Sequence, residues 1–441
     1  MTEKKQYPKP ERGICELYED DPERADAIVF GRTANPDRRG FLKGAGLATM
    51  GALVGGFIPF SHNMPGGLIP AAIADNLGSF KIEGKDGLII LNDRPINAET
   101  PAHLLNDEIT PNHRHFVRNN GIVPDNALKM DASDWTLSID GECNNPLVLT
   151  LDDLKNKFKH VTLNLQIECG GNGRSAFNPP ARGNQWTLGA IGNAQWTGVR
   201  YRDILKMAGV KDSAIYTAHY SADTHLSGNP DKLPISRGVP LAKAMEKHSI
   251  IAFAMNGEPI PAMHGFPVRT ICPGWPGSTS QKWLTRIQLR DVVHDGPKMT
   301  GKSYRIPAYP VAPGTKVPKS DFKIIEAMPV KSLITSHQTG STIKGTKMRV
   351  EGHAWAGDNR VKTLDISIDF GATWIKAHLA APPNTYSWQR FRADIAFPQA
   401  GYYEVWARAT DNKGNSQPFA VNWNPKGYLN NSMHRIAVNV V

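Results

Sequence analysis

One short stretch of the sequence, residues 164–175, combines a cysteine with several glycines and an arginine. Apolar residues alternate up to Ile167, which predicts a strand that enters a core. Cys169 follows, then three glycines within four residues, then Arg174. Glycine lets the backbone approach a ligand closely, and a thiolate suits a soft metal. Cys169 is therefore either a metal ligand or a buried structural cysteine before a turn.

A second group of polar residues lies in 215–283, on or beside loops that are rich in glycine and proline. The side chains that stand out are Asp223, His264, Arg269, Ser280 and Lys282. A large ligand that carries a phosphate requires fixed hydrogen-bond donors, backbone N–H groups and positive charge.

Three other residues have two interpretations each. Arg118 precedes Asn119 and Asn120 in a stretch with turn chemistry, so it belongs either to a site or to an ordinary solvated loop. Trp186 lies near the cysteine loop in sequence and is either part of the site or plain core. Arg174 either binds an anion or holds its own loop in place.

The composition limits the class of protein. A chain of 441 residues with 40% apolar residues can form two or three domains with a large core. The 40 glycines and 33 prolines favour many loops and strands over long helices. A net charge of +10 favours an anionic substrate or an acidic partner protein, and no nucleic-acid motif accompanies it. The four cysteines form no C-x-x-C, which argues against a zinc knuckle, a thioredoxin site or covalent haem.

The first 74 residues have the pattern of an export signal. Arg38 and Arg39 precede an apolar, Gly/Ala-rich run over 44–60, and small residues at 72–74 suit cleavage. Paired arginines before a mild apolar run indicate twin-arginine export, which moves folded proteins. The alternative is a membrane anchor, for which the run is short and glycine-rich. We therefore expect a periplasmic mature chain, without a stable membrane anchor, that starts near Asp75.

The elements that must position these residues fall in two regions. Residues 75–130 show no regular pattern, and 299–322, rich in Pro and Tyr, are expected to be a linker. Between them we predict strands at 135–140 and 250–255, a strand that leads into the turn at Cys169, and short helices ending near 158 and covering 201–208. From about residue 323, short strands recur with turns between them, which predicts an immunoglobulin-like sandwich. The strands expected there are 348–353, 361–368, 373–377, 391–397, 402–409, 420–421 and 434–440.

Four motifs occur in order along the mature chain: Arg118-Asn, Cys169-Gly-Gly-Asn-Gly-Arg, His264-Gly-Phe-Pro-Val-Arg and Lys282-Trp-Leu. Together with the sandwich they resemble the sulfite oxidase family of molybdenum enzymes, over essentially the whole mature chain. The resemblance implies an α+β fold, in which a mixed α/β molybdopterin domain of sulfite-oxidase type precedes an all-β immunoglobulin-like dimerisation domain. The expected division is a signal peptide over 1–74, a catalytic domain over 75–322 and the dimerisation domain over 323–441.

The resemblance also implies roles for individual residues. Cys169 matches the thiolate ligand of molybdenum. The residues that match the sulfite pocket are Arg118, Arg174, the wall residue Trp186 and the active-site tyrosine Tyr309, with Tyr304 as the alternative. The positions that match the binding site for the pterin and its phosphate are Asn119, Asn120, Asp223, His264, Arg269, Ser280, Gln281 and Lys282.

Two positions depart from the family pattern. Asn120 stands where the family usually has histidine, and an amide can donate to the pterin but cannot titrate. Lys426 stands in a segment that resembles one where vertebrate enzymes carry a third pocket arginine. It keeps the charge and loses the planar fork, so weaker substrate binding is expected.

The implied activity is molybdenum-dependent oxidation of sulfite to sulfate by oxygen-atom transfer. The cofactor would be molybdenum–molybdopterin, with no haem in this chain, and electrons would pass singly to an external acceptor such as a c-type cytochrome. The protein would form a homodimer through its C-terminal domain. The close alternative is a sulfane dehydrogenase subunit of a thiosulfate-oxidising complex, which shares this fold. From another class, the chain could be a metal-free exported binding or scaffold protein.

Overall fold

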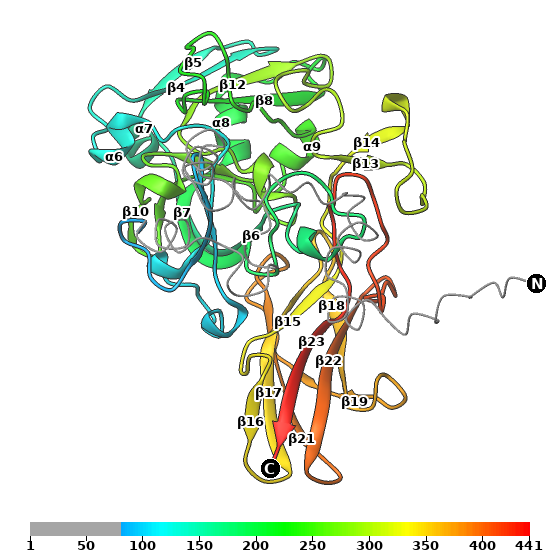
Figure 1. Cartoon of the computed structure of the whole chain (residues 1–441). Helices are drawn as coiled ribbons and strands as arrows, with labels where there is room; N and C mark the ends of the chain where they lie inside the picture. Colours follow the sequence, from blue (N-terminus) through cyan, green and yellow to red (C-terminus); the bar gives the residue numbers. More distant parts are fainter. Residues whose placement is uncertain (1–80) are drawn as a thin grey trace, which may run out of the picture. The chain divides into compact units, whose positions relative to one another are not determined.

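Strands and short helices make up the regular structure of residues 81–441, the part of the chain that the computed structural model describes (Figure 1). The export signal predicted for 1–74 lies outside these residues. The longest helix described, α8 (Tyr201–Ala208), has eight residues. No helix within 81–441 is long and apolar enough to cross a membrane. Residues Ile82–Val441 pack as one compact unit.

The cysteine strand belongs to a five-stranded sheet with the order β10–β9–β7–β6, in which β11 also pairs with β9. The strand β6 (His160–Glu168) pairs antiparallel with β7 (Ile191–Arg200) over its whole length. Its last four residues are all buried, so the segment runs deep into the core before Cys169. The other strands are β9 (Ile250–Met255), β10 (Glu258–Pro259) and β11 (Arg269–Ile271).

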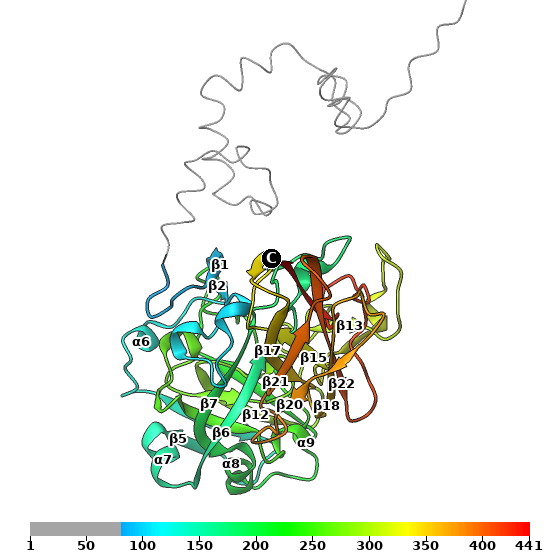
Figure 2. The ribbon, with the colours of Figure 1, turned by 90° about the horizontal axis from the view of Figure 1, so that it is seen from below.

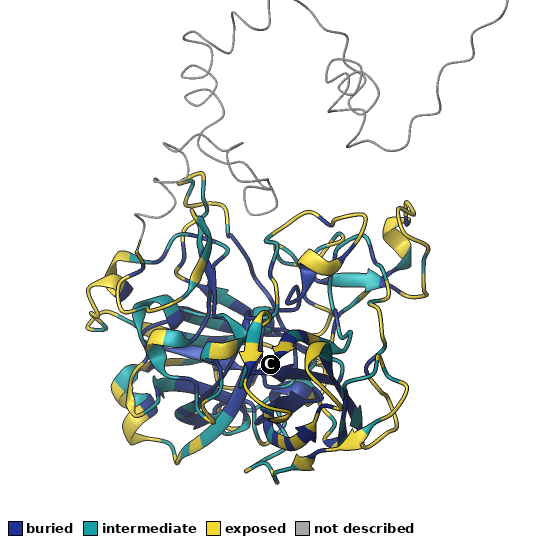
Figure 3. Ribbon diagram, turned by 60° about the horizontal axis from the view of Figure 1, so that its bottom comes forward, coloured by how far each residue is buried: buried dark blue, intermediate teal, exposed yellow. Residues whose placement is uncertain are grey.

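A second sheet has the order β5–β4–β12–β8. Its strands are β4 (Thr136–Gly141), β5 (Leu147–Thr150), β8 (Tyr216–Ser221) and β12 (Leu284–Arg290). Helix α7 (Leu151–Asn156) follows β5 and is capped by Thr150 and Asp153, which bond reciprocally in a capping box. Helix α8 contributes Ile204 and Leu205 to a cluster of buried residues shared by both sheets. Figure 3 colours the ribbon by burial, with buried segments in dark blue and exposed segments in yellow.

The described part of the region predicted to be irregular, residues 81–130, is more regular than expected. It contains β1 (Ile89–Asp93), β2 (Ile96–Glu99), β3 (Val117–Arg118) and α6 (Asp125–Leu128). The three strands form their own sheet. Strand β3 is only two residues long, so its pairing with β2 leaves no periodic signal, but this pairing sets the position of Arg118.

The C-terminal region is the predicted sandwich, whose strands run side by side in Figures 1 and 2. One sheet has the order β15–β17–β21–β20 and the other β16–β23–β22–β18–β19. Its strands are β15 (Lys331–Ile334), β16 (Ser341–Ile343), β17 (Lys347–Trp355), β18 (Val361–Ser367), β19 (Ile375–Lys376), β20 (His378–Leu379), β21 (Gln389–Ala396), β22 (Gly401–Asp411) and β23 (His434–Val440).

Two expectations about connecting segments were wrong. Residues 420–421 form no strand but belong to the long connection between β22 and β23. The segment 299–322 is not a plain linker, because β13 (Arg305–Pro307) pairs with β14 (Phe322–Ile324). A further short helix, α9 (Leu241–Ala244), precedes β9.

Candidate molybdopterin site

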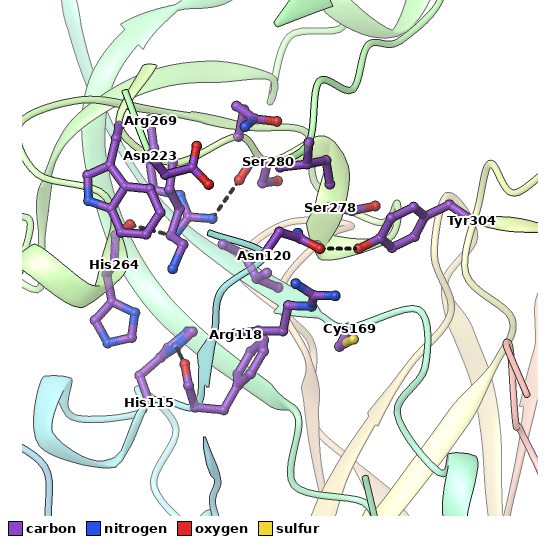
Figure 4. A pocket seen from close by; sticks show the side chains of 17 residues that line it. His115, Arg118, Asn120, Cys169, Asp223, His264, Arg269, Ser278, Ser280 and Tyr304 are labelled. Atoms are coloured by element: carbon purple, nitrogen blue, oxygen red, sulfur yellow. Dashed lines mark hydrogen bonds between the residues drawn. The ribbon is translucent and has the colours of Figure 1, made fainter. Parts of the chain in front are cut away.

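A cavity with about 650 Å³ of non-atom space, including its open mouth, brings together most of the residues singled out in the sequence. Figure 4 shows their side chains pointing into it from several elements. The predicted residues that line it are Arg118, Asn120, Cys169, Asp223, His264, Arg269, Ser280, Gln281 and Lys282.

The end of β6 sets the position of Cys169. Its N–H donates to the carbonyl of Ala190 at 2.9 Å, and its own carbonyl accepts from Asn172 at 2.8 Å. The local geometry favours glycine at two of the positions that follow. A side chain on Gly171 would clash with the Arg174 guanidinium, and Gly173 has φ +85°. The loop therefore turns tightly and leaves the buried Cys169 thiol at the cavity wall.

Positive charge dominates this cavity. Arg118, Arg269 and Lys282 line it with His264, and Asp223 is the only carboxylate among its lining residues. Burial lowers the pKa of Arg269 to about 9 and that of Lys282 well below its ordinary value. These cations lose hydration and do not gain a matching number of negative charges. An anionic ligand would supply the missing negative charge.

Several polar atoms around the cavity are buried and have no hydrogen-bond partner within the described chain. They are Arg118 Nη1, Asn119 Nδ2, Arg269 Nε, Ser278 Oγ and Gln281 Oε1. Buried polar groups are rarely left unpaired in a folded protein. This set contains both donors and acceptors, and it accompanies a thiol and an excess of cations. The residues present therefore fit a pterin with a phosphate, together with a metal at Cys169.

The amides Asn119 and Asn120 have different surroundings. Asn119 is buried, and its Oδ1 accepts a bond from the Lys282 ammonium, so it supports a lining residue without itself lining the cavity. Asn120 lines the cavity, and its Oδ1 accepts from Lys298 Nζ at 2.7 Å and from the Tyr304 hydroxyl at 3.4 Å. The cation of Lys298 thus lies beside the amide that replaces the expected histidine.

Tyr304, and not Tyr309, is the tyrosine that lines the cavity. Tyr304 is 4% exposed, whereas Tyr309 is 51% exposed and bonds Asp321 outside the cavity. Burial raises the pKa of Tyr304, but the charges of Arg118 and Lys298 outweigh this effect and lower its pKa overall. Tyr309 lies beyond the end of β13 (Arg305–Pro307) and is exposed, so Tyr304 replaces it as the candidate active-site tyrosine.

Arg174 and Trp186 also lie outside the cavity lining. Arg174 donates from Nε to the carbonyl of Lys426 at 3.1 Å and from Nη1 to the carbonyl of Asn184 at 3.0 Å. Its guanidinium lies 4.9 Å from the ring centre of Tyr428. Trp186 is 1% exposed and packs in the core cluster that contains Cys169. Both side chains therefore support the cysteine loop from outside the cavity. This position agrees with the interpretation of Arg174 and Trp186 as structural residues.

The segment that contains Lys426 closes over the cysteine loop. Leu429 N–H donates to the carbonyl of Gly170 at 2.9 Å, and Asn430 Nδ2 donates to the carbonyl of Gly173 at 2.8 Å. We call residues 424–430 the clasp. Lys426 does not line the cavity; burial, followed by the charge of Arg174, lowers its pKa.

Sequence reasoning missed three basic residues at the site. His115 lines the cavity, and burial lowers its pKa to about 3. The ammonium of Lys85 contacts His264 Nε2 and donates to the carbonyl of His115 at 2.8 Å, while Lys298 bonds Asn120. None belongs to a motif, and Lys85 and His264 are 179 residues apart. Only tertiary structure could reveal these contacts.

Comparison with known proteins gives two family matches. Residues 121–298 match the oxidoreductase molybdopterin binding domain, and residues 322–441 match the Mo-co oxidoreductase dimerisation domain. The mitochondrial sulfite oxidase of Drosophila melanogaster is 34% identical over 402 residues, which cover 85% of this chain and 68% of that protein. The sulfite oxidase of Arabidopsis thaliana is 30% identical over 374 residues, covering 78% of this chain and 91% of that protein.

The structure also resembles a solved one. The crystal structure of the sulfane dehydrogenase SoxCD from Paracoccus pantotrophus superposes with a TM-score of 0.65 at 25% identity, covering 88% of this chain and 98% of that chain. The fold is therefore a molybdopterin domain of sulfite-oxidase type followed by an immunoglobulin-like dimerisation domain, and the cofactor is molybdenum–molybdopterin. The chain belongs to the sulfite oxidase family of molybdopterin oxidoreductases.

Proposed function

We propose that this protein oxidises sulfite to sulfate by molybdenum-dependent oxygen-atom transfer and passes the electrons singly to an external acceptor. The observation that carries the proposal is that Cys169 and Arg118 line one buried, cationic cavity. When bound, molybdopterin supplies the metal and its two-electron oxygen-transfer chemistry. The chain's own residues bind, orient and enclose the reactants.

Sulfite is a small dianion, and Arg118 is the side chain best placed to bind it. Arg118 lies beside Cys169 and Tyr304, with Nη1 free of any partner in the described chain. A guanidinium forms charge-assisted bonds to oxyanions and orients them through its planar fork. Tyr304 is the hydroxyl donor on the same wall, and we assign it the bond to the departing sulfate. Burial strengthens both interactions by excluding water.

The remaining lining residues would hold the cofactor. Arg269 and Lys282 place positive charge near the phosphate. His264, whose pKa burial lowers well below its ordinary value, offers a neutral ring. Asp223, Ser280 and Gln281 provide acceptors and donors for the pterin. Ser221 links two of these groups, because its hydroxyl donates to Asp223 at 2.6 Å and accepts from Gln281 at 2.7 Å.

The test is an assay of purified protein with sulfite, using ferricyanide and then cytochrome c as acceptors, alongside metal analysis. Turnover with about one molybdenum per chain is expected. Metal-loaded protein without sulfite turnover would reject the proposal, and protein that binds no molybdenum when produced with the cofactor would favour a metal-free scaffold.

A sulfane dehydrogenase subunit is the second candidate, because the likeness to SoxCD extends over 88% of the chain. Turnover of a persulfide on a carrier thiol, with no turnover of free sulfite, would select it. We further propose a c-type cytochrome as acceptor and homodimerisation through 322–441, which light scattering on the purified protein tests.

Export by the twin-arginine route completes the proposal and rests on Arg38 and Arg39, outside the described residues. Replacing both with lysine should trap precursor in the cytoplasm. Cleaved double variant in the periplasm would contradict twin-arginine export.

A further inference from the structure

Tyr304 has a backbone conformation that its own side chain does not favour. Its φ is +52°, a left-handed value that non-glycine residues rarely adopt. The residue is 4% exposed, and its hydroxyl reaches Asn120 Oδ1 at 3.4 Å. A strained residue persists only where its surroundings hold it in place, so specific contacts must keep Tyr304 in this conformation.

The clasp supplies those contacts through Tyr428. The Tyr428 hydroxyl accepts a hydrogen bond from the Tyr304 N–H at 3.2 Å. The two rings stack with centroids 5.7 Å apart and an interplanar angle of 20°. Tyr428 thus contacts both the strained backbone and the aromatic ring of the same residue.

Tyr428 is itself anchored from two sides. Its N–H bonds Asn424 Oδ1 at 3.2 Å, and the neighbouring Leu429 bonds Gly170 in the cysteine loop. The Arg174 guanidinium lies 4.9 Å from its ring centre. The position of Tyr304 is thereby linked to the loop that carries Cys169.

A buried arginine also contacts the Tyr304 ring. The Arg237 guanidinium lies 4.8 Å from the ring centre, and Nη1 donates to the carbonyl of Lys298 at 3.2 Å. Arg237 therefore supports the ring, but it makes no bond to the Tyr304 backbone among the described residues. The Tyr304 N–H donates to Tyr428, and the Tyr304 carbonyl accepts from the Ile325 N–H at 3.1 Å, so Tyr428 is the side chain that bonds this backbone.

We propose that Tyr428 is a positioning residue, which holds Tyr304 in its left-handed conformation so that the hydroxyl points into the cavity. The role of the Tyr304 hydroxyl in turnover rests on the proposed function. The contact between Tyr428 and Tyr304 is independent of that function. Tyr428 acts through Tyr304 and need not touch substrate.

Tyr428→Phe removes only the acceptor hydroxyl and keeps the ring. Hydrogen exchange of the 299–308 region should then speed up roughly fivefold or more at the Tyr304 amide, while molybdenum content stays unchanged. In sulfite turnover, kcat should fall roughly fivefold with little change in KM. Tyr402→Phe, at an exposed tyrosine of the same C-terminal region, is the matched control and should change neither readout.

A double-mutant cycle separates positioning from general damage. Adding Tyr428→Phe to Tyr304→Phe should lower kcat no further, because the hydroxyl being positioned is already absent. Unchanged amide exchange in Tyr428→Phe, or multiplicative losses of kcat in the double variant, would overturn the inference. If the wild type does not turn over sulfite, the proposed function fails, and amide exchange still decides whether Tyr428 holds Tyr304.

Discussion

The carboxylate of Glu168 bonds the ammonium of Lys331 at 2.6 Å in the interior of the protein, where their side chains are 1% and 6% exposed. Glu168 ends β6, directly before Cys169, whereas Lys331 begins β15 of the sandwich. Trp355 Nε1 bonds the second carboxylate oxygen at 2.9 Å, and Asn172 Nδ2 bonds the first at 3.1 Å. The residue beside the cysteine is thus fixed by the C-terminal domain.

Removing one partner of this pair should be costly. Lys331→Met leaves a buried carboxylate without its counter-charge, which costs about 3–5 kcal/mol of unfolding free energy. Denaturant unfolding measures the loss, and molybdenum content should fall with it. Combining Glu168→Gln with Lys331→Met should recover much of the stability, because no buried charge then remains unpaired. A single variant as stable as the wild type would show that the pair does not stabilise the fold.

Cys169→Ser should preserve the fold and abolish sulfite oxidation, because a hydroxyl is a poor ligand for a soft metal. Circular dichroism, molybdenum analysis and turnover on one preparation check this outcome. Cys143 and Cys272 are free, buried thiols outside the cavity lining, so Cys143→Ala and Cys272→Ala serve as controls that should keep their metal and activity. Near-wild-type turnover of Cys169→Ser would refute the assignment of the ligand.

Arg118 and Arg174, both predicted from the sequence to line the sulfite pocket, should differ in their effect on sulfite KM. Arg118 lines the cavity, so Arg118→Gln should raise sulfite KM roughly ten- to a hundredfold through the loss of a charge-assisted bond. Arg174 bonds two backbone carbonyls behind the cysteine loop. Arg174→Gln should therefore lower Tm or molybdenum content, with KM per bound metal unchanged. A strong KM effect of Arg174→Gln at full metal content would restore its role as a substrate ligand.

Protein prepared without cofactor should become more stable as pH rises from 7 to 9. Burial lowers the pKa of Lys85 from 10.5 to about 7. Between these values the unfolded chain binds more protons than the folded one, so unfolding free energy increases with pH. Below pH 7 the penalty for burying this ammonium is fully present.

Loading with molybdopterin should flatten this dependence, because the phosphate supplies counter-charge and raises the pKa of nearby cations. Tm measured across the pH range for cofactor-free and loaded protein tests both statements. Lys85→Met, the matched variant, should show a smaller rise when cofactor-free. If Tm of the cofactor-free wild type and variant rose equally with pH, Lys85 would not be the cause of the pH dependence.

Local patterns in the sequence predicted much of the fold. Alternation and helical spacing located β6, α8 and β9, and the regular recurrence of strands predicted the sandwich. The two-residue β3 escaped prediction, because its existence depends on pairing with β2 and not on its own residues.

The sequence predicted which residues reach the cavity where those residues belong to motifs. It predicted less well the roles that depend on contacts with residues distant in sequence. Cys169, Arg118 and Lys282 do reach one cavity. Arg174 and Trp186 are near Cys169 in sequence, yet the loop turns them toward the core and the clasp. Tyr304 and Tyr309 share one Pro/Tyr-rich stretch, and only the tertiary structure, in which Tyr304 is buried at the cavity and Tyr309 is exposed, distinguishes them.

The clasp also sets an order of events during synthesis. Gly173 is bonded by Asn430, which the ribosome adds 257 residues later. A nascent chain that has exposed the cysteine loop therefore lacks the segment that fixes it. The metal site reaches its final form only after Asn430 has left the ribosome, so cofactor insertion into the completed site follows the synthesis of the clasp.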